Sequence, residues 1–195
     1  MRFQLVLLGA ALVACGRDEP KAPIEDLTPP PPPATADVAA LDEFGPFEGR
    51  VNGVAFWVHP SVPFNSMAIV STDKGLLALN IEDGKEVARV EGFKGGAVQV
   101  IYDGVYPIID PDGFKSRGVV VARDDDAGKI RFFEVHNAAR ELTELGDGFA
   151  VGEIEAFCAG PQSDGSNRLV VFRGSKMLTY DLDIGADRVA AAPTA

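Results

Sequence analysis

The sequence predicts an all-β fold of the β-propeller type, with about three four-stranded blades, or half of a six-bladed ring. Beyond residue 42 the chain consists of short β-rich runs separated by Gly, Asp, Asn and Pro, with no long stretch of helical periodicity. A strand–turn–strand pattern also recurs, and its central turns, at Lys74, Asp126 and Gly174, lie about 50 residues apart, as in propeller blades.

The first predicted blade spans residues 50–92, and its clearest part is 67–90, MAIVSTDKGLLALNIEDGKEVARV. An apolar strand at 68–71 turns through residues 72–75 into a second strand at 76–81. Asp83 and Gly84 then turn the chain into a third strand at 86–90, because Asp-Gly between apolar runs is a strong hairpin signal. A further strand at 52–58 completes the four.

The second and third predicted blades repeat this pattern over residues 95–146 and 150–192. The predicted strands of the second are 97–102, 118–122, 129–136 and 141–145, and those of the third are 152–157, 168–172, 176–181 and 187–191. Propellers close a ring of about four to eight blades, so a row of three leaves apolar faces uncovered at its ends. We therefore expect a homodimer, with another propeller half or a truncated reading frame as alternatives.

The N-terminal residues 1–15, MRFQLVLLGAALVAC, have the build of an export signal: Arg2, an apolar run and small residues before Cys15. Residues 12–15, LVAC, resemble a bacterial lipobox, in which the cysteine receives lipid. An ordinary cleaved signal is the alternative. Residues 16–43 include five consecutive prolines and predict an extended spacer ahead of a folded domain at 44–195. We expect lipid anchoring in the cell envelope, either at the outer membrane facing the periplasm or in an exported form.

Composition argues against a nucleic-acid partner, because the net charge is −11 and the basic residues are interleaved with acids.

If Cys15 is lipidated, Cys158 has no disulfide partner, and its apolar context predicts a buried small residue. No Gly-x-Ser-x-Gly and no phosphate-binding glycine loop is present. His59 is expected to pack or to hydrogen-bond rather than to act as a base.

Residues 56–87, FWVHPSVPFNSMAIVSTDKGLLALNIEDGKEV, carry a family resemblance. Trp57, His59-Pro60, Lys74-Gly75 and the turn at 83–85 make this stretch similar to the first blade of the β-propeller phytases. These are six-bladed, calcium-dependent phosphatases that hydrolyse inositol hexakisphosphate. The similarity continues through residues 99–103, 121–123 and 129–135, and covers about the first half of such a domain.

The resemblance implies that Lys74 and Arg123 grip substrate phosphates, since both match positions where the family uses basic side chains. Solvated turn charges are the alternative for both. Asp124, Asp125 and Asp126 form a candidate calcium site, with a solvated turn as the alternative because adjacent side chains point apart. No catalytic residue is assigned.

The chain also departs from the family pattern at its metal-binding positions. Residues 52–55 are NGVA where phytases resemble Asp-Asp-Pro-Ala, and residues 96–99 are GAVQ where the family has an Asn-Asn-Val-Asp-like run. Glu155-Ala156 stands where the family has a Tyr-Gly pair. We therefore expect a phytase-like, non-catalytic binding or scaffold module without a cofactor. The alternative is a calcium-dependent phosphatase of the 3-phytase type.

Overall fold

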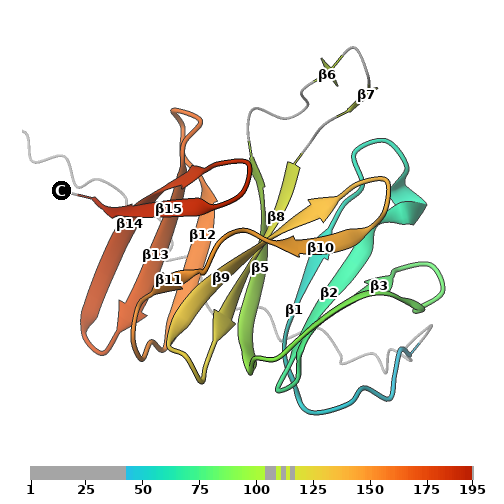
Figure 1. Ribbon diagram of the computed structural model, residues 1–195, viewed down its shortest axis with the longest axis horizontal. Coiled ribbons are helices and arrows are strands. Elements are labelled where there is room, and N and C mark those ends of the chain that lie inside the picture. Colours follow the sequence, from blue (N-terminus) through green and yellow to red (C-terminus); the bar gives the residue numbers. More distant parts are fainter. Residues whose placement is uncertain (1–42, 104–108, 111–112, 115–116, 195) are drawn as a thin grey trace, which may run out of the picture. The chain divides into compact units, whose positions relative to one another are not determined.

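The computed structural model describes residues 43–103, 109–110, 113–114 and 117–194. The predicted signal peptide, Cys15 and nearly all of the predicted spacer lie outside the described residues. The chain from Asp42 to Ala195 clusters into one compact unit, which is built from β-strands (Figure 1). Within the described ranges, no helix has both the length and the apolar character needed to cross a membrane.

The strands form three antiparallel sheets, each following chain order from an inner to an outer strand. Sheet 1 contains β1 (Val51–Trp57), β2 (Met67–Thr72), β3 (Gly75–Asn80) and β4 (Glu86–Glu91). Sheet 2 contains β5 (Gly95–Asp103), β8 (Arg117–Asp124), β9 (Lys129–His136) and β10 (Glu141–Glu144), with β11 (Phe149–Ala150) also pairing with β9. Sheet 3 contains β12 (Ala156–Pro161), β13 (Asn167–Arg173), β14 (Lys176–Ile184) and β15 (Val189–Pro193).

Two short elements connect strands of these sheets. A 3-10 helix, η1 (Pro63–Asn65), lies between β1 and β2. The long connection from β5 to β8 contains a two-stranded hairpin of β6 (Ile109–Asp110) and β7 (Gly113–Phe114).

The structure confirms the prediction of an all-β fold with three four-stranded units, and it corrects two strands of the third. The inner strand predicted at 152–157 is instead Ala156–Pro161, because the amides of Val151 and Gly152 both bond to the Gly128 carbonyl, at 3.0 Å each, in sheet 2. The outer strand predicted at 187–191 is Val189–Pro193. Closure of the three sheets into a ring stays a prediction.

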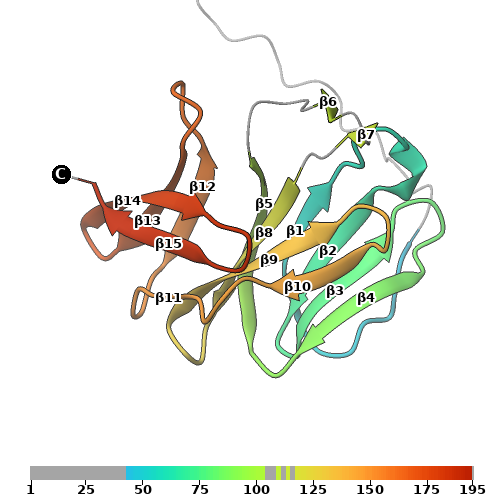
Figure 2. The ribbon, with the colours of Figure 1, turned by 45° about the horizontal axis from the view of Figure 1, so that its top comes forward.

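Sheet 2 is buried on both faces because it lies between the other two (Figure 2). Along β8, Val120 and Ala122 pack against sheet 1, whereas Val119 and Val121 pack against sheet 3. All four side chains are fully buried. This double burial explains why residues 118–122 form an uninterrupted apolar run rather than an alternating one.

Cys158 is exposed, so the prediction that it is buried is wrong. Successive side chains of a strand point to opposite faces. Phe157 and Ala159 of β12 pack in the core shared with sheet 2, so Cys158 lies on the other face of sheet 3. The apolar residues beside Cys158 in the sequence did not indicate that this face of sheet 3 is exposed.

Candidate functional site

The structure places Lys74 and Arg123 at the same edge of neighbouring sheets. Lys74 is in the turn between β2 and β3, and Arg123 is near the end of β8. The glycine pair at the start of β5 lies between them: a Cβ on Gly95 would lie 2.8 Å from the Thr72 carbonyl oxygen, and one on Gly96 would lie 2.6 Å from Arg123 Nε. Thus both predicted phosphate-binding residues flank one backbone segment.

Arg123 is held by contacts within the protein. Its Nε donates to Asp125 Oδ1, and its Nη1 donates to the carbonyl oxygens of Ile154, at 3.3 Å, and Glu155, at 3.1 Å. The guanidinium therefore ties sheet 2 to the linker that leads into sheet 3. By contrast, the exposed Lys74 ammonium makes no hydrogen bond or ion pair with any described residue.

Two of the three consecutive carboxylates have separate partners, and the third is exposed. The buried Asp124 accepts a hydrogen bond from the Ala127 amide at 3.0 Å, and its other oxygen lies 3.6 Å from Arg131 Nη1. Asp125 forms the ion pair described above, and Asp126 is exposed. In the part of the chain that the structure describes, no group of three or more His, Cys, Asp or Glu side chains is arranged to hold a metal ion.

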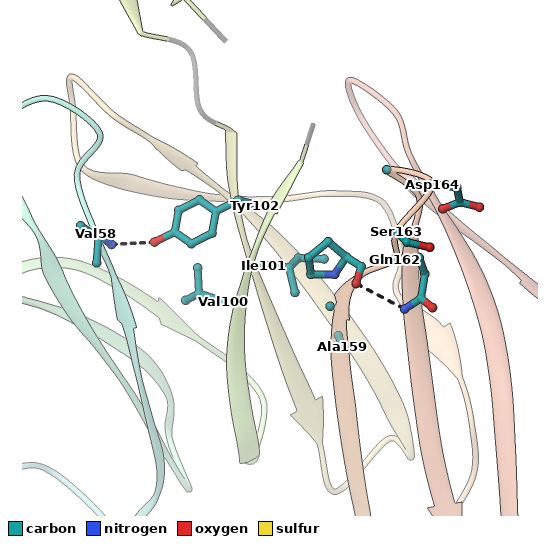
Figure 3. A pocket seen from close by; sticks show the side chains of 11 residues that line it. Val58, Val100, Ile101, Tyr102, Ala159, Gln162, Ser163 and Asp164 are labelled. Atoms are coloured by element: carbon teal, nitrogen blue, oxygen red, sulfur yellow. Dashed lines mark hydrogen bonds between the residues drawn. The ribbon is translucent and has the colours of Figure 1, made fainter. Parts of the chain in front are cut away.

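A pocket of about 760 Å³ opens at the other end of the inner strands (Figure 3). On one side, Val58, just after β1, lies beside Val100 and Tyr102 of β5, which point toward sheet 1 (Figure 3). On the opposite side, Ile101 of β5 points toward residues 159–165, at the end of β12 and in the β12–β13 loop. Residues from all three sheets or the segments next to them therefore contribute to one cavity.

Two hydrogen bonds between sheets hold the pocket walls. The Val58 amide donates to the Tyr102 hydroxyl at 2.8 Å, which links sheet 1 to sheet 2. The Ala159 amide donates to Gln99 Oε1 at 2.6 Å, which links sheet 3 to sheet 2 and satisfies a backbone group on the edge strand β12. Because these bonds are made within the chain, the cavity is already formed without a ligand.

The β12–β13 loop supplies the polar rim of the pocket. Asp164 Oδ1 accepts hydrogen bonds from the Ser166 amide at 3.0 Å and from its hydroxyl at 2.6 Å. These bonds hold the pKa of Asp164 below its ordinary value, so the carboxylate is charged at neutral pH. Gln162 Oε1 and the Ser163 hydroxyl have no hydrogen-bond partner among the described residues, and so are available to a ligand.

His59 has a structural role, as the sequence suggested. Its Nδ1 accepts hydrogen bonds from the amides of Ser61, at 3.2 Å, and Val62, at 3.1 Å, and its ring meets Trp57 edge-on at 5.3 Å. Partial burial lowers the pKa of His59 below 6.5; a hydrogen bond with the backbone of Asn137 opposes this shift, and the charge of Arg140 adds to it. Protonation would also remove the acceptor that fixes the 59–62 turn.

We predict that the free energy of unfolding falls as the pH is lowered through about 6.5, and that His59→Asn reduces this dependence. Because the folded pKa is depressed, the unfolded chain takes up this proton first. The contribution is therefore complete above the unfolded pKa and is lost as the pH falls toward the folded one. Urea unfolding between about pH 7.5 and about pH 5.5 measures the slope. An unchanged slope in His59→Asn would contradict the prediction.

Comparison with protein-family models and with curated proteins finds no match for this chain. The likeness to β-propeller phytases therefore rests on the sequence motifs described above. Sequence reasoning missed the pocket, although Tyr102, which lines the cavity, lies in the phytase-like stretch 99–103. The residues of the opposite wall carried no recognisable motif.

Proposed function

We propose that this chain is a phytase-like binding module, lipid-anchored in the cell envelope through Cys15, that takes a small and mainly apolar molecule in the pocket between β5 and β12. The residues that line the pocket are the main support for this proposal. Val58, Val100, Ile101 and Ala159 form apolar walls, and the polar side chains gather in the β12–β13 loop. Small-molecule pockets typically have about 300–1,000 Å³ and combine apolar walls with a few polar groups.

The predicted spacer fits this role. About 26 residues at about 3.1 Å each, where extended, reach up to about 80 Å. A lipid on Cys15 would thus hold the folded part at the envelope while keeping the pocket clear of the membrane surface. Metabolic labelling with a fatty acid tests this part of the proposal, and label that survives Cys15→Ala would contradict it.

Ligand binding is tested with Ala159→Phe in the full chain. Ala159 lies on the face of β12 that meets sheet 2, lines the pocket and is only partly buried, so a larger side chain there would occupy pocket volume. We expect the wild type to bind an apolar, environment-sensitive dye saturably, and Ala159→Phe to lose that binding. Glu82→Phe is the control, because it adds the same ring at an exposed turn outside the pocket. Equal dye binding by Ala159→Phe and wild type would refute the site.

The phosphatase alternative makes a different prediction. Phosphate release from inositol hexakisphosphate by the family route requires several bridging metal ions and free basic side chains. Arg123 is engaged by Asp125 and two carbonyl groups instead. We expect no release from the purified chain with excess calcium. Calcium-dependent release that falls in Lys74→Ala would replace the binding-module proposal with the enzyme.

A further inference from the structure

The three sheets repeat position by position. Leu76, Ile130 and Met177 each pair with the penultimate residue of the preceding strand, in sheets 1, 2 and 3 respectively. Leu76 and Ile130 are 0% exposed because the next sheet in the row covers them, whereas Met177 is 63% exposed. Sheet 3 therefore presents an apolar side chain at a position that its two predecessors bury.

The opposite end of the row shows the complementary pattern. Val54, Val98 and Phe157 occupy equivalent positions on the inner strands, since they pair with Val70, Ala122 and Val171, each third from the end of its strand. Val98 and Phe157 are each 7% exposed because the preceding sheet covers them. Within the described residues no sheet precedes sheet 1, and Val54 is 50% exposed.

We call the exposed face of sheet 1 that carries Val54 the sheet 1 end face, and the exposed face of sheet 3 that carries Met177 the sheet 3 end face. Both faces carry further exposed side chains. On the sheet 1 end face, Phe56 follows Val54 along β1 and is 64% exposed. On the sheet 3 end face, Phe172 pairs with Met177 and is 40% exposed, and Cys158 on β12 is exposed as well.

Part of sheet 1 is already covered by the chain itself. Phe47 packs on the cluster formed by β2 and β3, whose members are Ala68, Val70, Leu77 and Leu79. The open strip of the sheet 1 end face therefore follows the inner strand β1. An incoming sheet needs to cover this strip and not the whole sheet.

We infer that the sheet 3 end face of one copy packs on the sheet 1 end face of a second copy, and that the reciprocal contact closes a ring of six blades. Among the described residues, each of the two cores between sheets joins the face of one sheet that carries Leu76 or Ile130 to the face of the next sheet that carries Val98 or Phe157. The end faces of sheet 3 and sheet 1, which carry Met177 and Val54, are the corresponding two faces that no described sheet covers. Two copies can thus form two identical contacts related by a two-fold axis, and six blades fall within the range of closed propellers.

The test uses the full chain carrying Cys15→Ser, which removes the lipidation site and leaves Cys158 as the only thiol. Light scattering is expected to give twice the 20.6 kDa of one chain. Phe56→Asp and Met177→Asp should each halve the mass, because either one removes both contacts. Phe64→Asp is the control: Phe64 is 61% exposed, but it lies in η1 and not on a sheet face.

Mixing the two monomeric variants identifies the mode of contact. Phe56→Asp retains its sheet 3 end face and Met177→Asp retains its sheet 1 end face, so one contact between them is restored and a species of two chains should reappear. Cys158 should react with a maleimide more slowly in the wild-type assembly than in Phe56→Asp. A monomeric wild type, an open-ended polymer, or a dimer that only one of the two substitutions disrupts would overturn the inference.

Discussion

Replacing Trp57 with alanine is expected to lower the free energy of unfolding by about 3–5 kcal/mol. The indole is fully buried at the end of β1, in the cluster that joins sheets 1 and 2. Its removal leaves a cavity that the paired backbones of two sheets cannot collapse to fill. Urea unfolding followed by far-UV circular dichroism measures the loss, since the substitution also removes the only tryptophan fluorophore.

A substitution at Gly118 tests how closely the Trp57 ring is packed. A Cβ on Gly118 would lie 2.5 Å from Trp57 Cδ1, so Gly118→Ala should cost about 1–3 kcal/mol by overpacking. In a Trp57→Phe background that cost should shrink, because the smaller ring makes room for the methyl group. Trp57 Nε1 has no hydrogen-bond partner among the described residues, so replacing Trp57 with phenylalanine leaves no other polar group without a partner. Equal costs of Gly118→Ala in both backgrounds would show that the two residues do not compete for space.

The strands and hairpin turns were predictable because their signals are local. The Asp83-Gly84 turn, the apolar run at 118–122 and the strand at 129–136 all lie where the sequence placed them. The inner strand of sheet 3 was misplaced because residues 151–152 bond back to Gly128 in sheet 2. That preference depends on a contact between sheets, which strand periodicity does not encode.

The candidate site was less predictable for the same reason. Lys74 and Arg123 were selected by resemblance, but the partners that occupy Arg123 include carbonyl groups 31 and 32 residues away. The pocket depends on a hydrogen bond between Gln99 and Ala159, which are 60 residues apart. Neither residue has a side chain typical of a binding motif, so only the packed structure shows that Gln99 fixes the strand whose residue Ala159 lines the cavity.

The second large expected loss of stability concerns sheet 2, because that sheet is buried on both faces. Phe132→Ala and Phe133→Ala are each expected to cost about 3–5 kcal/mol, because both rings are fully buried. The rings point to opposite faces: Phe132 packs in the core shared with sheet 3, and Phe133 stacks on Phe93 at 5.9 Å in the core shared with sheet 1. Phe64→Ala is the matched control, expected to stay within about 0.5 kcal/mol because that ring is exposed.

Although the two losses should be similar in size, amide hydrogen exchange should tell them apart, because it reports opening region by region. Phe132→Ala removes packing on sheet 3, so protection should fall first in β13. Phe133→Ala removes packing on sheet 1, so protection should fall first in β2 and β3. If both variants lost protection in the same sheet, the two faces of sheet 2 would be supporting one cooperative unit. The stability of each end of the row would then not depend on its own contact with sheet 2.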